Sequence, residues 1–368
     1  MKNYLTANIS ASAVKYNLSQ LRKKLNSSVK LCPVVKDNCY GHGIELLYPT
    51  LAEQCDGFIV ASPSEALEIR SFGYNGFILC LLSAYFDETD IQKELIKKQI
   101  TQTVMSKSAL ETISNVAKKC NLIAPIHLKI DTGMGRLGVA SQQAANLINL
   151  IKKSSNVNLT GAYTHFATAD DIDTTFMYKQ LETFNEILPK ERSLIKHAAN
   201  TSALVDHPKT HLDLVRPGLS VYGCHYANHL RSKINLKPCM SVHAQIIAIK
   251  IMPSGSYSGY GKSYKYERKS RIAVIPIGYG DGYFRSLSNQ AVVQIKGKFA
   301  PVRGRVSMDQ ITVDITDHPE LNIGDSVEII SNNPLAPNSV ENLARLANTI
   351  PYEITCHMGR NLNHKLVD

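Results

Sequence analysis

The sequence predicts an α/β protein, a (β/α)8 TIM-like barrel followed by a mostly β C-terminal domain, and three observations support this fold class. The chain has 368 residues, more than one hydrophobic core usually holds, so two domains are expected. In its first two-thirds, short apolar runs alternate with segments of helical periodicity, as in parallel strands joined by helices. After a polar stretch at residues 225–235, β-like segments follow one another with few helices between them.

The predicted barrel strands are short apolar runs that end in polar loops. They span residues 30–36, 57–61, 76–82, 101–105, 126–131, 159–166, 194–200 and 212–218. A first helix is expected at residues 10–25, where Val14, Leu18, Leu21 and Leu25 recur at helical spacing behind serine cap candidates. Because periodicity cannot show whether a sheet closes, a doubly wound sheet is the alternative. Its dinucleotide-binding version lacks the G-x-G-x-x-G motif after the first strand.

The second domain is expected to be built mainly from strands. The strand candidates span residues 240–251, 271–280, 291–297, 310–316 and 326–330. One helix, at residues 339–348, interrupts them late in the chain. We place the barrel at residues 8–230 and the β domain at residues 231–368, and we expect residues 1–7 to join the β domain as an extra strand.

Composition narrows the class of protein. With 44% hydrophobic and 20% charged residues the chain is typical of soluble globular proteins, and no apolar segment approaches the ~20 residues that span a bilayer. The net charge of +10 comes from scattered lysines, without an arginine-rich run carrying interleaved aromatics, so nucleic-acid binding is not expected. The eight cysteines form no C-x-x-C pair, which favours a reducing compartment. We expect a cytoplasmic protein that attracts anionic small molecules and has no metal site and no membrane contact.

Cationic and imidazole side chains gather at the ends of the predicted barrel strands, where the active-site face of such a barrel lies. They are Lys36 after the first strand, Lys129 and Arg136 at the fifth, His165 at the sixth, His197 at the seventh and Arg216 at the eighth. Burial at the end of an apolar strand lowers the pKa of an ammonium group, and a neutral amine can attack a carbonyl. The pattern predicts a positive pocket for a phosphorylated, carboxylate-bearing ligand, with Lys36 as a Schiff-base lysine.

The same segments resemble motifs of the alanine racemase family, in order and along nearly the full chain. These segments are CPVVKDNCYGHG, HLKIDTGMGRLG, THFATAD, HAANTSA, VRPGLSVYG, IPIGYGDG and GRVSMDQ. The resemblance implies that Lys36 carries pyridoxal 5′-phosphate. The further cofactor contacts it implies are Tyr40, His165, Asn200, Thr201, Arg216, Gly218, Leu219 and Tyr352.

Arg216 would face the pyridine nitrogen of that cofactor. A guanidinium group donates a hydrogen bond but has no proton to give at working pH, so the ring becomes a weak electron sink. A weak sink restrains transamination and decarboxylation and favours returning a proton to Cα.

Racemisation needs a base on each face of the substrate Cα. By resemblance, Lys36 serves one face and Tyr260, in PSGSYSGYGKSY, serves the other, with His165 linking Tyr260 to Arg216. Ser258 and Gly259 stand where the family usually has valine and serine, and the neighbouring tyrosines at positions 257 and 264 are the alternatives for the second base.

Substrate recognition is also implied by the resemblance. Arg136 and the backbone at Met308 would bind the substrate carboxylate. Lys129, carbamylated in some members of the family, would orient Arg136, with His197 in support. Tyr279 and Tyr352 would narrow the entrance and limit the size of the substrate side chain.

The implied assembly is a head-to-tail homodimer in which Tyr260, Tyr279, Met308 and Tyr352 reach the barrel of the partner subunit. The implied activity is interconversion of L- and D-alanine, supplying D-alanine for bacterial peptidoglycan. Three alternatives stay open: a racemase of broader or different specificity such as serine, a basic amino-acid decarboxylase on the same two-domain plan, and a non-catalytic cofactor carrier. Arg216 argues against the decarboxylase, and the β domain with Tyr260 argues against the carrier.

Overall fold

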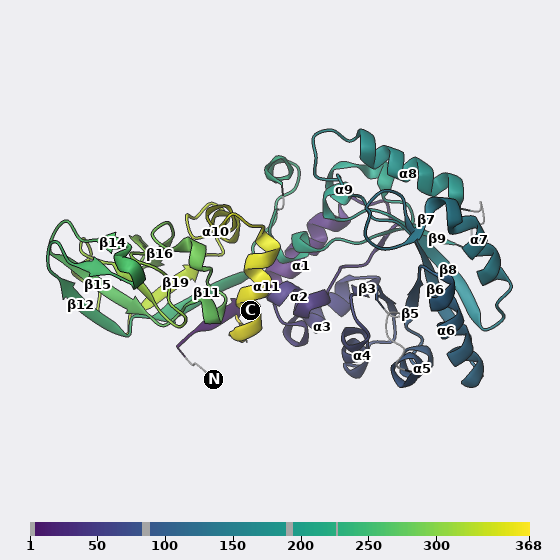
Figure 1. Cartoon of the computed structure of the whole chain (residues 1–368), viewed down its shortest axis with the longest axis horizontal. Helices are drawn as coiled ribbons and strands as arrows, with labels where there is room; N and C mark the ends of the chain where they lie inside the picture. The colour runs from purple at the N-terminus through teal and green to yellow at the C-terminus, as the bar shows by residue number, and fades with distance from the viewer. Residues whose placement is uncertain (1–3, 83–88, 189–193, 226) are drawn as a thin grey trace.

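The computed structural model describes residues 4–82, 89–188, 194–225 and 227–368, which form two lobes (Figure 1). One lobe contains eight parallel strands. They are β2 (Lys30–Leu31), β3 (Gly57–Val60), β4 (Phe77–Cys80), β5 (Thr101–Val104), β6 (Ala124–Asp131), β8 (Val157–Tyr163), β9 (Ile195–His197) and β10 (Leu214–Val215). Strands β3 to β9 are hydrogen-bonded in the order β3-β4-β5-β6-β8-β9, β10 pairs with β2, and the short β7 (Val139–Ala140) pairs with β6.

Backbone contacts at two seams close these strands into a barrel. At one seam Val34 bridges Ile59 in parallel, and the Val35 N–H donates to the Ile59 carbonyl at 2.9 Å. At the other, the Asp213 N–H donates to the Lys196 carbonyl at 3.0 Å. The predicted (β/α)8 barrel is therefore confirmed, and the doubly wound alternative is wrong.

Helices cover the outside of the barrel (Figure 1). They are α1 (Ala11–Arg22), α3 (Ile44–Gln54), α4 (Pro63–Ser71), α5 (Thr89–Lys97), α6 (Lys107–Lys119), α7 (Ser141–Lys152), α8 (Thr175–Ile187) and α9 (Thr201–Asp206). The side chains of Ser10, Ser62 and Ser106 cap the first turns of α1, α4 and α6, as serine at these positions commonly does. Among the described segments, no helix is long and apolar enough to cross a membrane.

The other lobe is mostly β. Its strands are β11 (Met240–Gln245), β12 (Ala248–Met252), β13 (Tyr257–Ser258), β14 (Tyr264–Lys265), β15 (Ser270–Ile275), β16 (Val292–Ile295), β17 (Lys298–Pro301), β18 (Ile311–Asp314), β19 (Ser326–Ile330) and β20 (Asn363–Leu366). One sheet has the order β17-β16-β19-β11-β1-β20 and another the order β12-β15-β18. The strand β1 (Thr6–Ile9) pairs with β11 antiparallel and with β20 parallel, so residues 6–9 lie in the sheet of the second lobe.

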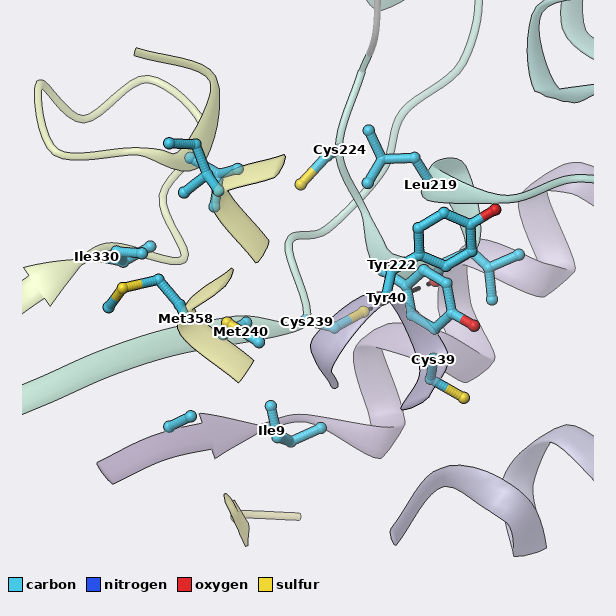
Figure 2. Packing of buried hydrophobic residues seen from close by; sticks show 14 of the residues in the cluster. Ile9, Cys39, Tyr40, Leu219, Tyr222, Cys224, Cys239, Met240, Ile330 and Met358 are labelled. Carbon is cyan, nitrogen blue, oxygen red and sulfur yellow. Dashed lines mark hydrogen bonds between the residues drawn. The ribbon is translucent and has the colours of Figure 1, made fainter. Parts of the chain in front are cut away.

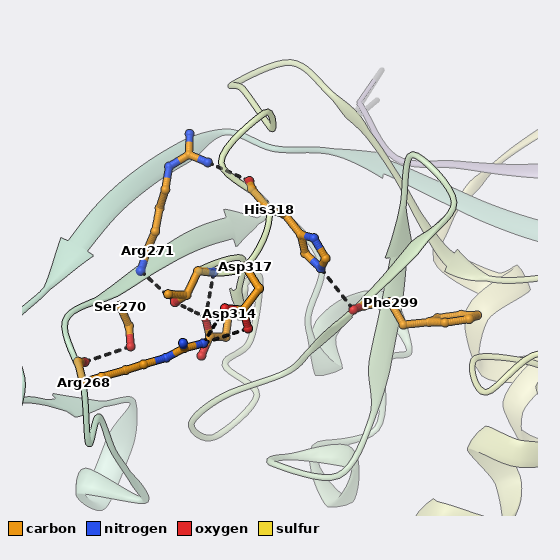
Figure 3. Close-up of polar contacts among 8 residues, drawn as sticks. Arg268, Ser270, Arg271, Phe299, Asp314, Asp317 and His318 are labelled. Atoms are coloured by element: carbon orange, nitrogen blue, oxygen red, sulfur yellow. Dashed lines mark hydrogen bonds and ion pairs between the residues drawn. The ribbon is translucent and has the colours of Figure 1, made fainter.

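Polar contacts hold the loop after β18 against neighbouring strands (Figure 3). Arg268 places one guanidinium nitrogen 2.7 Å from each carboxylate oxygen of Asp317. Arg271 donates to the His318 carbonyl at 3.0 Å, while the His318 ring lies 3.4 Å from the Phe299 carbonyl. These contacts fix the outer edge of the β lobe, away from the barrel.

Several predicted boundaries differ from the structure. The strand expected at 240–251 is two strands, β11 and β12, which belong to different sheets because the chain turns at Ile246 and Ile247. The strand expected at 271–280 ends at Ile275 and gives way to a 3-10 turn at Tyr279–Asp281. The expected helix at 339–348 is α10 (Val340–Ala347), but α11 (Pro351–Asn361) was not predicted, although Pro351 stands in its first turn as proline often does.

Apolar packing joins the two lobes without a break. Figure 2 shows Ile9, Met240 and Met358 on the β side of this cluster and Tyr40 and Tyr222 on the barrel side. All five are buried, so the lobes share one hydrophobic core around α11 and the start of the barrel. This core fixes the position of the barrel rim that carries Lys36.

Candidate active site

A cavity of about 480 Å³ opens at the carboxyl ends of the barrel strands. Most of the predicted site residues line it: Lys36, Tyr40, Lys129, Arg136, His165, Asn200, Thr201, Arg216, Gly218 and Tyr352. They come from different strands and loops and meet only because the barrel brings the strand ends together.

Lys36 begins a turn, α2 (Lys36–Gly41), instead of ending a strand as expected, because β2 already stops at Leu31. From Asp37 to Tyr40 the φ angles lie between 51° and 56°, so four consecutive residues adopt a left-handed helical turn without glycine. Each such residue costs about 1–2 kcal/mol relative to the right-handed form. Contacts from outside the turn must therefore hold it.

The side chains of His42 and Tyr222 stabilise this turn. The His42 Nδ1 lies 2.9 Å from the Cys39 carbonyl and 3.1 Å from the Tyr40 carbonyl, so this nitrogen donates to both. The His42 ring stacks on Tyr222 at 4.6 Å, and the Tyr222 hydroxyl donates to the Val34 carbonyl just before the turn. Figure 2 shows Tyr222 beside Tyr40 at the end of the turn.

Helix α11 and strand β20 clamp the end of the turn from the other lobe. A Cβ placed on Gly359 would lie 1.9 Å from the Gly41 carbonyl oxygen, so the two backbones touch only because Gly359 has no side chain. The His364 Nε2 donates to the same carbonyl at 2.7 Å. Arg360 also lies 3.6 Å from the Asp37 carboxylate.

Hydroxyls and a glycine shape one end of the cavity. The Gly218 N–H donates to the Thr201 hydroxyl oxygen at 3.0 Å, and a Cβ on Gly218 would lie 2.7 Å from the Tyr40 hydroxyl. Asn200 accepts a hydrogen bond from the Ala203 N–H and so caps α9. This end offers donors to a small anion and space for it to approach the backbone.

Arg216 is buried and also lines the cavity. Its guanidinium donates to His197 Nδ1 at 2.7 Å, to the Thr164 carbonyl at 2.8 Å and to the Ala198 carbonyl at 3.0 Å. A longer contact of 3.5 Å reaches His165 Nδ1. Within the described residues Arg216 forms no ion pair with a carboxylate, and burial lowers its pKa to about 10.

The cavity is electrostatically positive. Burial, with Arg216 and Arg136 nearby, lowers the pKa of Lys129 to about 8. Burial and the same two arginines lower the pKa of His165 to about 3, so this imidazole is neutral at physiological pH. Because Lys36 adds a further cation, the site favours an anionic ligand.

Three predicted residues do not reach this cavity. Tyr260, Tyr279 and Met308 lie in the β lobe and are 69%, 44% and 56% exposed. Tyr260 opens the 3-10 turn Tyr260–Lys262 beside β14, which lies at the far end of that lobe from the barrel (Figure 1). The Gly280 N–H donates to the Met308 carbonyl, so Tyr279 and Met308 lie close together.

Two other predicted residues support the cavity from behind. The side chain of Leu219 is fully buried next to Gly218, and it is not part of the cavity lining. His197 is also fully buried and touches the site through Arg216.

Sequence reasoning missed further residues of the site. Met134, Phe166, Asp170 and Ile350 line the cavity. Tyr163 also lines it and stacks on His197, with ring centroids 4.8 Å apart and an interplanar angle of 11°. Strand alternation offered a signal for Tyr163, because it stands two residues before His165 and so faces the same side.

Comparisons with known proteins agree with this architecture. A family model described as "Alanine racemase, N-terminal domain" matches residues 9–226, and one described as "Alanine racemase, C-terminal domain" matches residues 239–366. Alanine racemase from Halothermothrix orenii is 36% identical over 362 residues, 97% of this chain and 95% of that protein. Alanine racemase from Methanococcus maripaludis is 37% identical over 361 residues, 95% of each chain.

Solved structures give the same result. The crystal structure of alanine racemase from D-cycloserine-producing Streptomyces lavendulae superposes with a TM-score of 0.93 at 31% identity, covering 100% of this chain and 98% of that one. Alanine racemase from Bacillus anthracis with bound L-Ala-P gives a TM-score of 0.90 at 26% identity, covering 100% and 96%. The chain therefore belongs to the alanine racemase family and is an amino-acid racemase.

Proposed function

We propose that the protein interconverts L- and D-alanine with pyridoxal 5′-phosphate, using Lys36 and Tyr260 as opposed bases. One observation carries the proposal: Lys36 shares its cavity with a buried Arg216 that has no carboxylate partner within the described residues. Lys36 is a lysine that can bond to a carbonyl, and Arg216 is a guanidinium in the same cavity. Together they favour return of a proton to Cα over decarboxylation. We further propose that the D-alanine supplies peptidoglycan and that the protein acts in the cytoplasm.

The residues present fit the proposed cofactor. Gly218, Thr201 and Tyr40 make a cradle for its phosphate that a Cβ on Gly218 would fill. The Leu219 backbone follows this cradle directly, and Asn200 and Tyr352 border the same cavity. The positive cavity matches the phosphate and the substrate carboxylate.

When bound, pyridoxal 5′-phosphate supplies an electron sink for the charge left on Cα after proton removal. Lys36 holds or returns a proton on one face of Cα. Arg216 would donate a hydrogen bond to the ring nitrogen of the bound cofactor without protonating it. His165 accepts from Arg216 at Nδ1, so its Nε2–H is left to donate to an oxyanion at the cavity mouth.

The second base comes from the partner subunit in this proposal. The ring centroids of Tyr264 and Tyr266 are 5.1 Å apart, and the Arg303 Cζ lies 4.6 Å from the Tyr264 ring centroid. The Tyr264 ring therefore packs within its own lobe. Tyr260 is the most exposed of the three loop tyrosines and projects from the lobe. A head-to-tail homodimer would bring Tyr260, Tyr279 and Met308 to the partner's barrel and complete two sites.

Arg136 is proposed to bind the substrate carboxylate, with the backbone at Met308 of the partner subunit. Lys129 lies beside Arg136, and its lowered pKa leaves a fraction of neutral amine able to add CO2. The resulting carbamate would be an anion that accepts hydrogen bonds from Arg136, which the ammonium cannot do. Intact-protein mass before and after CO2 depletion tests this: a Lys129 that never carries the added mass of CO2 contradicts the carbamate.

A broader or serine-directed racemase is the second candidate, since Tyr352 and Ile350 line the cavity while Tyr279 stays outside it within one chain. The test is isomer exchange by the purified protein with L- and D-alanine, run beside serine and lysine. Alanine is expected to exchange fastest in both directions. Exchange of serine alone, or none with alanine while the cofactor stays bound, overturns the proposal.

Two variants separate the roles of the bases. Lys36→Ala is expected to lose the covalent cofactor and its visible absorbance. Tyr260→Phe should keep that absorbance but lower kcat in both directions by about 10²–10⁴-fold, as loss of a general acid–base group does. Tyr264→Phe is the matched control and should keep turnover; an inactive Tyr264→Phe with an active Tyr260→Phe would reassign the second base.

A further inference from the structure

His127 is a fully buried histidine inside the barrel, below the cavity and outside its lining. It lies on β6 two residues before Lys129, so both side chains face the barrel interior. Its neighbours in register are Thr103 on β5 and Gly161 on β8. A Cβ on Gly161 would lie 2.5 Å from the His127 Nε2, so the space for this imidazole exists because the adjacent strand carries glycine there.

A directed chain of hydrogen bonds connects His127 to Arg216. Arg216 lies 2.7 Å from His197 Nδ1, and His197 Nε2 lies 2.9 Å from His127 Nδ1. A guanidinium has donors but no acceptor, so His197 must accept at Nδ1. The proton of a neutral His197 is then on Nε2 and is donated to His127, whose own proton is on its Nε2.

Both imidazoles are neutral in this environment. Burial, and then the charge of Arg216, lowers the pKa of His127 to about 3 and that of His197 well below its ordinary value. Neutral histidine has two tautomers, and only the Nε2–H form of His197 presents a lone pair to Arg216. In the Nδ1–H form, the His197 Nδ1–H and the Arg216 N–H would be two donors facing each other at 2.7 Å.

We propose that His127 is a positioning residue: by accepting the Nε2–H of His197 it selects the tautomer that holds the Arg216 guanidinium at the cavity. Without this acceptor, the buried His197 Nε2–H has no partner in the barrel interior among the described residues, and the two tautomers become closer in free energy. Arg216 then loses its shortest hydrogen bond in part of the population. The consequence for turnover rests on the proposed function, in which Arg216 contacts the cofactor ring, whereas the tautomer selection does not.

The first test measures tautomers directly in the protein without cofactor. Long-range ¹H–¹⁵N NMR of ¹⁵N-histidine-labelled protein distinguishes a protonated from an unprotonated ring nitrogen, and His197→Gln assigns the resonances. Wild type is expected to show His197 only as the Nε2–H tautomer. His127→Leu should add the Nδ1–H form, whereas His127→Asn, whose amide oxygen replaces the Nδ1 acceptor, should not.

The second test measures turnover and the absorbance of the bound cofactor. His127→Leu is expected to lower kcat for alanine by about 10–100-fold, as a small misplacement at a distance can, with little change in KM and a shifted cofactor absorbance. His127→Asn should restore kcat. The matched control is Gln102→Leu: Gln102 is also fully buried on a barrel strand, but it stands one residue before Thr103 and faces away from the interior.

The outcomes separate this inference from the proposed function. An unchanged His197 tautomer in His127→Leu, a mixture in wild type, or an equal loss of kcat in Gln102→Leu overturns the positioning role. If His127→Leu does not fold, a wild-type mixture or an inactive His127→Asn overturns it instead. A wild type with the single tautomer but no alanine exchange overturns the proposed function and leaves the tautomer selection standing.

Discussion

The charged side chain of Lys129 lowers the stability of the folded protein. It is 7% exposed and faces Arg216 and Arg136, and these surroundings lower its pKa from 10.5 to about 8. Between pH 8 and 10.5 the folded chain binds fewer protons at this site than the unfolded chain, so stability rises with pH across that window. Below pH 8 the full penalty remains.

Lys129→Met is therefore expected to stabilise the cofactor-free protein at neutral pH. Removing the buried ammonium should raise the free energy of unfolding by about 1–3 kcal/mol at pH 7, and the gain should shrink as the pH approaches 10.5. Urea unfolding in CO2-depleted buffer at pH 7 and pH 10 measures this. If Lys129→Met is destabilised equally at pH 7 and at pH 10, the buried ammonium does not destabilise the folded protein.

The sequence predicts the site residues that lie at the ends of barrel strands, but it does not predict those that lie deeper inside the barrel. Lys36, His165 and Arg216 could be predicted, because the barrel rule assigns their strand ends to one face. His127 could not, because a buried histidine in a strand usually packs without a functional role. Only the register of β6, β8 and β9 shows that His127 meets His197.

At the scale of elements, the left-handed turn of α2 depends on α11. Alanine is a better helix former than glycine by about 1 kcal/mol, so Gly359→Ala would stabilise an isolated helix. In this protein the added Cβ would meet the Gly41 carbonyl, which belongs to the turn that carries Lys36 and Tyr40. Overpacking of this kind usually costs about 1–3 kcal/mol and moves the backbone.

Gly359→Ala is expected to lower the free energy of unfolding and to weaken cofactor binding together. Urea unfolding and fluorescence titration with pyridoxal 5′-phosphate measure the two effects. His357→Ala, two residues earlier on an exposed part of the same helix, is the control and should leave cofactor affinity unchanged. A Gly359→Ala protein that is more stable and binds the cofactor normally would show that α11 does not hold the turn.

The elements also show where the sequence pattern stops being informative. The apolar runs predicted all eight barrel strands, but β2, β9 and β10 are shorter than expected because their ends bend into loops. The turn from Asp37 to Tyr40 was not predictable, since four left-handed residues in a row contradict local preference. Tertiary contacts from His42, Tyr222 and α11 decide its conformation.

At the scale of the whole molecule, one chain holds most of a site but not all of it. The cavity contains Lys36, Arg136 and Arg216, whereas Tyr260 and Met308 lie exposed on the other lobe. A role for Tyr260 in an active site was not predictable from sequence without the family resemblance, because a tyrosine in a glycine-rich loop is usually a surface turn residue. In the proposed homodimer each site takes Tyr260 from the partner subunit.

Mixing two inactive variants tests this sharing. Lys36→Ala and Tyr260→Phe homodimers each lack one base in both sites. A mixed dimer has one site with both changes and one with neither, because the barrel of the Tyr260→Phe chain meets the unaltered Tyr260 of the partner subunit. With random exchange half of the dimers are mixed, so about one quarter of wild-type activity per site should return. Dissociation and reassociation of the two proteins, followed by alanine exchange, measures the recovery. A mixture that stays inactive although exchange of subunits is demonstrated by mass would place both bases in one chain.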